Sequence, residues 1–133
     1  MKHDDGRFVA ETEVLIVDDH YEIAALLAEA LTDEGYRVRV AHDGVAALAA
    51  IRSCRPNLLL LDVAMPLMSG DQLLLLLKRE QLTDFPVILM TADQAPERFR
   101  ALGAAQVLDK PFDLWHLLQI VGYYTKHAYL RPW

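Results

Sequence analysis

The chain alternates short runs of apolar residues with segments of helical periodicity, and this alternation limits the fold more than any other feature. The first run, residues 14–17, reads Val-Leu-Ile-Val and ends at an acidic pair. An unbroken β-branched run of this length is typical of a strand that is buried on both faces. Apolar residues then follow at helical spacing: Ile23, Leu26, Leu27, Ala30 and Leu31. This stripe predicts an amphipathic helix that Gly35 closes.

The strand-then-helix pair recurs four more times along the chain. Further strands are expected at residues 37–40, 57–61, 86–90 and 106–108. Helices are expected at residues 45–51, 72–80 and 97–102, and after Asp113, where Leu114, Leu117, Leu118 and Val121 share one face. Alternating units of this kind form a parallel sheet, and right-handed crossovers place helices on both of its faces. The sequence therefore predicts a doubly wound α/β sandwich with a five-stranded parallel sheet.

The composition favours one compact domain in the cytoplasm. The chain has 133 residues, 53% of them apolar, which is enough to form a substantial core. It has 13 basic and 19 acidic residues, a net charge of −6, which argues against direct binding to nucleic acid or to an anionic membrane surface. Cys54 is the only cysteine, so no internal disulfide can form and a reducing compartment is expected. The longest apolar run, residues 45–51, is far shorter than the ~20 residues of a membrane span.

Polar residues follow the expected strands at one edge of the sheet, where ligands bind in folds of this kind. They are Asp18, Asp19, Asp62, Thr91 and Lys110. Three converging carboxylates repel one another unless a cation lies among them, and hard oxygen ligands suit Mg2+ or Mn2+. An ionised Asp62 can accept a phosphoryl group, while Thr91 and Lys110 can bind the oxygens of that group. The pattern favours phosphoryl chemistry.

Each of these residues also has a simpler structural explanation. The acidic pair can cap a helix, Asp62 can form a local turn, and Thr91 can cap the segment that follows it. His20, beside the pair, is interpreted as a surface residue that starts the first helix and not as a metal ligand. A functional site is favoured because these polar residues stand at the same end of four strands.

Several short motifs resemble those of the response-regulator receiver domain of bacterial two-component signalling. They are the residues at 14–19, Gly35-Tyr36, Ala41, Asp43-Gly44, the segment 59–66 with Gly70, the segment 87–92, Gly103-Ala104 and the segment 108–112. The resemblance covers residues 13–128. Residues 1–12 are polar and show no periodicity, so a flexible N-terminal extension is expected there, and residues 129–133 are expected to form a C-terminal tail. It implies a flavodoxin-like sheet with the strand order 2-1-3-4-5.

The resemblance also implies a role for each residue at the sheet edge. Asp62 is the expected phospho-acceptor and also a metal ligand, Asp19 is a direct Mg2+ ligand and Asp18 a ligand through water. Ala64 is expected to offer its backbone carbonyl to the metal. Thr91 and Lys110 are expected to hold the phosphoryl group. The implied donor is a sensor histidine kinase or a histidine phosphotransfer protein, and the domain catalyses only its own phosphoryl transfer and dephosphorylation.

The sequence departs from the receiver pattern in two places. Val107 stands where the family usually has Tyr or Phe, whose ring changes position on activation, so the usual coupling to Thr91 is in doubt. Within the run of leucines at 73–77, Leu75 and Leu76 fall where charged residues are common. They are interpreted as exposed leucines, with a contact surface for a partner or for a second copy of the chain as the alternative.

The sequence also argues against two other classes of protein with a related fold or chemistry. A haloacid-dehalogenase phosphatase needs a second Asp two residues after the nucleophile, where this chain has Ala64. A flavodoxin-like nucleotide binder needs a Gly-rich or Ser/Thr-rich phosphate loop, whereas residues 18–22 are largely acidic. The main alternative is an interaction module with a receiver fold that works without phosphorylation. The output partner is expected to be a downstream protein or an effector domain. The sequence is consistent both with a stand-alone receiver and with one domain of a longer protein.

Overall fold

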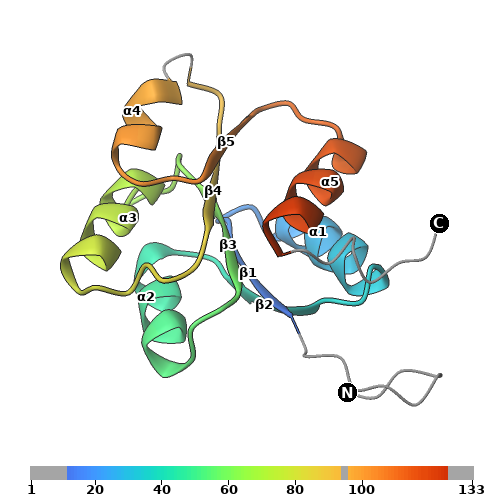
Figure 1. Ribbon diagram of the computed structural model, residues 1–133, viewed down its shortest axis with the longest axis horizontal. Helices are drawn as coiled ribbons and strands as arrows, with labels where there is room; N and C mark the ends of the chain where they lie inside the picture. The colour runs from blue at the N-terminus through green and yellow to red at the C-terminus, as the bar shows by residue number, and fades with distance from the viewer. Residues whose placement is uncertain (1–11, 94–95, 126–133) are drawn as a thin grey trace.

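The computed structural model describes residues 12–93 and 96–125. Strands and helices alternate along the chain, as Figure 1 shows. The strands are β1 (Glu13–Val17), β2 (Arg37–Ala41), β3 (Leu58–Asp62), β4 (Val87–Thr91) and β5 (Gln106–Asp109). The helices are α1 (Tyr21–Asp33), α2 (Gly44–Ser53), α3 (Gly70–Arg79), α4 (Pro96–Ala101) and α5 (Leu114–Thr125). The expected extension and tail fall mostly outside the described residues, so the domain boundaries stay a prediction.

All five strands are parallel and lie in the order β2-β1-β3-β4-β5. Helices α1 and α5 cover one face of the sheet, while α2, α3 and α4 cover the other (Figure 1). The predicted doubly wound sandwich and its strand order are thus confirmed. None of the described helices is long and apolar enough to cross a membrane.

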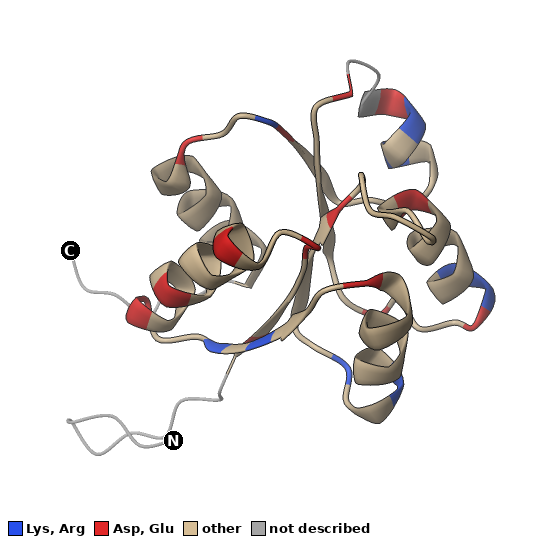
Figure 2. Cartoon of the chain, turned by 180° about the vertical axis from the view of Figure 1, so that it is seen from behind, with Lys and Arg blue, Asp and Glu red and all other residues tan. Residues whose placement is uncertain are grey.

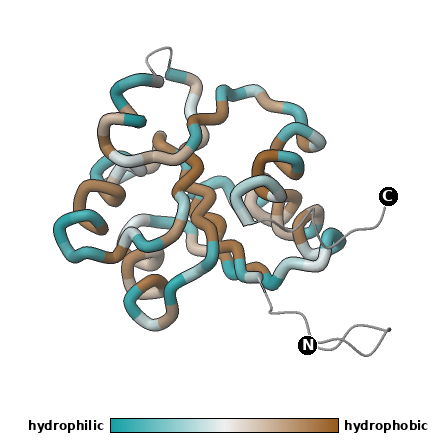
Figure 3. Tube along the Cα trace, viewed as in Figure 1, coloured by the Kyte–Doolittle hydropathy of each residue, from teal (hydrophilic) through white to brown (hydrophobic). Residues whose placement is uncertain are grey.

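The core is divided by the sheet into two clusters. Strands β1, β3 and β4 are buried along their whole length, and Figure 3 shows this hydrophobic band in the middle of the molecule. Alternate residues of a strand point to opposite faces, so Leu59 and Leu61 join the cluster under α2 and α3, while Leu58 and Leu60 join the cluster under α1 and α5. Burial of one such leucine contributes about 1.5–3 kcal/mol.

Helix α1 faces the sheet with a narrower stripe than the periodicity predicted. Ala24, Leu27 and Leu31 are buried, whereas Ile23 and Leu26 are 41% and 57% exposed. The amphipathic helix itself is confirmed, but Ile23 and Leu26 of the predicted apolar stripe do not face the sheet. Ala24, Leu27 and Leu31 pack in the cluster under α1, so Ile23 and Leu26 lie on a part of the helix surface that faces solvent.

The structure of α3 shows which leucines of the run at 73–77 face the core, which the periodicity of the sequence alone did not determine. Leu73, Leu74 and Leu77 are buried, Leu75 is exposed and Leu76 is half-buried. The helix starts two residues earlier than expected because Ser69 and Gln72 form a reciprocal capping box, in which each side chain accepts the other residue's backbone N–H.

Candidate functional site

Two buried aspartates stand side by side at the carboxyl edge of the sheet. Asp18 directly follows β1 and Asp62 ends β3, and the pairing of Val17 with Leu61 makes these two residues neighbours. Their side chains are 0% and 1% exposed. Asp19 is half-buried beside them. Figure 2 shows acidic positions gathered near the centre of this edge, where the inner strands run into their loops.

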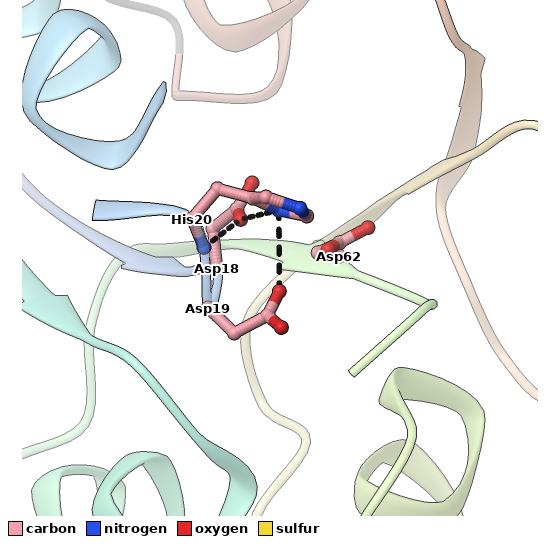
Figure 4. Close-up of side chains that lie close together, drawn as sticks. All are labelled: Asp18, Asp19, His20 and Asp62. Carbon is pink, nitrogen blue, oxygen red and sulfur yellow. Dashed lines mark hydrogen bonds and ion pairs between the residues drawn. The ribbon is translucent and has the colours of Figure 1, made fainter. Parts of the chain in front are cut away.

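His20 completes the acidic group. One potential ligand atom from each of Asp18, Asp19, His20 and Asp62 lies within 4.8 Å of the others (Figure 4). The structure therefore brings together the three carboxylates that the sequence singled out and adds an imidazole to them.

Lys110 approaches the same group from the end of β5. Its ammonium Nζ donates a hydrogen bond of 2.8 Å to Asp62 Oδ1. The pKa of the Asp62 carboxyl lies above its ordinary value, chiefly because burial removes the charged form from water and also because Asp18 lies nearby. The Lys110 ammonium and a hydrogen bond with the backbone of Ala64 act in the opposite direction and lower that pKa.

Three carboxylate oxygens of the cluster are buried and make no hydrogen bond within the described part of the chain. They are Asp18 Oδ2, Asp19 Oδ1 and Asp62 Oδ2. Buried polar atoms are normally satisfied, and oxygens of this kind are the ligands that Mg2+ prefers. The residues present thus fit a divalent cation.

Thr91 lies at the end of β4, next to the acidic group in the order of the sheet. Its side chain is buried, and Oγ1 accepts a hydrogen bond of 2.9 Å from the backbone N–H of Asp93. This bond is the capping contact that the simpler explanation expected. The hydroxyl proton of Thr91 can still be donated to an anion, and the Lys110 N–H bonds to the Thr91 carbonyl at 2.8 Å, so the two residues are held together.

Comparison with known proteins agrees with this geometry. The sequence model of the response regulator receiver domain matches residues 14–122. This chain is a response-regulator receiver domain. Receiver domains belong to two-component signalling and are signalling proteins, not conventional enzymes.

Relatives of this receiver domain include longer proteins. The chain is 43% identical over 108 residues to the response regulator MprA of Mycobacterium ulcerans and to that of Mycobacterium tuberculosis, which covers 79% of the chain and 46% of each relative. The chain thus spans about half the length of these relatives. Among solved structures, the chemotaxis protein CheY4 of Vibrio cholerae has 33% identity and a TM-score of 0.79 over 86% of this chain and 99% of its own. The receiver domain of NtrX from Brucella abortus has 30% identity and a TM-score of 0.77 over 85% and 98%.

Two features of this receiver site escaped the sequence reasoning. His20 does start α1, as expected, but its Nδ1 atom lies 3.0 Å from Asp18 Oδ1 and 3.2 Å from Asp19 Oδ1. Gly70 packs against the strand that carries the candidate phospho-acceptor, because a Cβ atom on Gly70 would lie 2.3 Å from the carbonyl oxygen of Asp62. The position of Gly70 in the motif was visible in the sequence, whereas the contact that requires a glycine was not.

Proposed function

We propose that this receiver accepts a phosphoryl group on Asp62, with Mg2+ held by the neighbouring carboxylates, and that the modification changes its protein contacts. One observation carries the proposal: Lys110 bonds to one oxygen of the buried Asp62 carboxylate, while the other oxygen lies near Asp18 and Asp19 and has no hydrogen-bond partner among the described residues. Such an oxygen has a lone pair available for attack on phosphorus.

The donor in this proposal is a phosphohistidine on a sensor kinase or a phosphotransfer protein. The Asp62 carboxylate attacks phosphorus, a P–O bond forms as the P–N bond of the donor breaks, and the donor imidazole keeps the electron pair and takes up a proton. Lys110 offers positive charge and Thr91 a hydroxyl donor to the transferred oxygens. The proposed metal ligands are Asp19, Asp62, Asp18 through water and the backbone carbonyl of Ala64. Bound Mg2+ would neutralise charge on the phosphoryl oxygens.

The test is the intact mass of the protein after incubation with Mg2+ and acetyl phosphate. We expect one added phosphoryl group on the natural chain and none on Asp62→Asn or in the presence of a metal chelator. Lys110→Ala is expected to reduce the rate by about a hundredfold or more, as loss of one electrostatic donor does elsewhere. Lys78→Ala, at an exposed position of α3, is the matched control. No adduct, even from a phosphohistidine donor, would refute the proposal.

Val107 supports a second candidate, an interaction module that works without phosphorylation. The structure places this ringless side chain in the core, where it is 8% exposed and packs with the cluster under α2, α3 and α4. A buried valine has no ring that could move outwards on activation. If this candidate is right, a partner binds Asp62→Asn and the natural chain equally well, with or without acetyl phosphate.

The wider setting also belongs to the proposal. The folded unit is residues 13–128, and its output is contact with a downstream protein or an attached effector domain. The net charge of −6 favours a protein partner over direct contact with nucleic acid or a membrane. A second copy of the chain is a further candidate partner. The exposed thiol of Cys54 is compatible with a cytoplasmic location.

A further inference from the structure

We propose that His20 is a nitrogen ligand of this metal site, and that it lets the site bind a late first-row divalent ion such as Zn2+ in competition with Mg2+. The inference rests on the proposed metal site and concerns which ions the site selects. It assigns to His20 a role beyond starting α1.

The contacts of His20 are the first step of the argument. Its backbone N–H donates to Asp18 Oδ1 at 2.8 Å, and its ring Nδ1 lies 3.0 Å from the same oxygen and 3.2 Å from Asp19 Oδ1. The ring makes no capping hydrogen bond to α1, and Ser, Thr, Asp and Asn are the preferred residues at such a position. The ring is thus directed at the carboxylates and not at the end of the helix (Figure 4).

The buried oxygens are the second, independent step. Asp18 Oδ2 and Asp62 Oδ2 belong to side chains that are 0% and 1% exposed, and neither atom makes a hydrogen bond within the described residues. A buried carboxylate oxygen without a donor is costly unless a cation binds it. The His20 side chain is 57% exposed and that of Asp19 is 26% exposed, so the four-residue group has one ligand at the surface, one that is half-buried and two in the interior.

The preferred ligands of Mg2+ and of Zn2+ differ, and this difference is the third step of the argument. Mg2+ prefers an octahedron of oxygens and keeps several waters, so an imidazole adds little to its affinity. Zn2+, Ni2+ and Co2+ bind imidazole well, and Zn2+ accepts a tetrahedral set of nitrogen and carboxylate ligands. For His20 to bind, Nδ1 must present its lone pair, with the ring proton on Nε2. An ion so placed would also engage Asp62, and it would therefore block phosphorylation that depends on Mg2+.

The proposal is tested by titration calorimetry of the full chain with ZnCl2 and, separately, with MgCl2. His20→Asn is the informative variant, because Asn is a favoured residue at the start of a helix and should preserve α1. We expect the ratio of Zn2+ to Mg2+ affinity to fall by at least about tenfold, since even residues that only orient a metal ligand change affinity 10–100-fold. His116→Asn removes an exposed histidine of α5 and should leave the ratio as it is.

Two further measurements locate the ion. Excess Mg2+ should weaken Zn2+ binding at this site, and the 15N resonance of His20 Nδ1 should shift on addition of Zn2+, while that of His116 should not. Equal Zn2+ affinity for His20→Asn and the natural chain, or a His20 resonance that does not respond to Zn2+, would overturn the proposal.

The outcome is separable from that of the proposed function. If Zn2+ binds through His20 but Mg2+ and phosphodonors give no adduct, phosphorylation is refuted and the metal inference stands. If the phosphoryl adduct forms with Mg2+ but the affinity for Zn2+ does not depend on His20, only the inference about His20 is refuted.

Discussion

Asp62 is an acidic side chain in the interior of the protein, and its environment has consequences for stability as well as for chemistry. Burial raises the pKa of its carboxyl, and the hydrogen bond from Lys110 offsets only part of this effect. The folded protein therefore binds a proton at Asp62 more tightly than the unfolded chain does. The contribution of Asp62 to stability is fullest below the ordinary pKa of 3.8 and is lost as the pH rises through the raised value.

Asp62→Asn should accordingly stabilise the metal-free protein at neutral pH, because it removes a charge that burial penalises. The gain should shrink as the pH falls towards 4, where the natural carboxyl also becomes neutral. Thermal unfolding in the presence of a chelator, measured across this pH range, checks both statements. Asp33→Asn, at the exposed end of α1, serves as the control. A lower melting temperature for Asp62→Asn at pH 7 would contradict the prediction.

At the scale of elements, the first residue of α3 packs directly against the end of β3. Helix α3 begins at Gly70, and this glycine packs on the backbone of Asp62 and Val63. The Gly70 N–H also donates to the Val63 carbonyl at 2.9 Å. The loop between the two elements is thus closed by direct backbone contact next to the candidate phospho-acceptor.

Gly70→Ala should therefore destabilise the fold. The added Cβ would lie 2.3 Å from the Asp62 carbonyl oxygen, which is backbone and cannot turn away as a flexible side chain can. We expect a loss of about 1–3 kcal/mol, the usual cost of overpacking, measured by urea unfolding. Phosphorylation should also slow, because the end of β3 must shift. Lys78→Ala in the same helix should change neither quantity appreciably.

Leu67, in the same loop, has an unusual combination of backbone and exposure. Its φ is 68°, in the left-handed region, and its side chain is fully exposed. Asn tolerates this conformation better than Leu does. We predict that Leu67→Asn stabilises the protein by about 0.5–1 kcal/mol in urea unfolding, since no buried contact is lost and strain is relieved. A destabilised variant would show that the exposed leucine packs against something in solution.

At the scale of the whole molecule, metal binding should raise stability. The cluster joins the ends of β1 and β3, and its four ligand atoms come together only in the folded chain. A metal ion whose free concentration is ten times its dissociation constant raises the free energy of unfolding by about 1.4 kcal/mol. We therefore expect Mg2+ to raise the melting temperature by about 5 °C. Asp19→Asn should reduce this shift, and an equal shift for that variant would place the ion elsewhere.

The architecture could be predicted from sequence because its signals are local. The runs at 14–17, 58–61 and 87–90, which lie in β1, β3 and β4, are apolar without interruption, a pattern typical of a strand that is buried on both faces. Asp18 and Asp62 could be placed at one edge because parallel strands end on the same side of a sheet.

Other features depend on distances between segments that are far apart in the chain. Helix α1 buries Ala24 and exposes Ile23 and Leu26, and the periodicity of the sequence does not determine which apolar residues of the stripe face the sheet. Likewise, Gly70 must be a glycine because the backbone of Asp62 passes beside it.

The sequence by itself determined the order of the elements, the parallel sheet and the edge at which the polar residues gather. These follow from periodicity and chain direction, which are properties of neighbouring residues. Only the tertiary structure decided that His20 Nδ1 lies close to one carboxylate oxygen of Asp18 and one of Asp19, and that Asp18 Oδ2 and Asp62 Oδ2 are buried without a hydrogen bond among the described residues. Burial and contact are set by all the surrounding elements together, so they become visible only when the chain is folded.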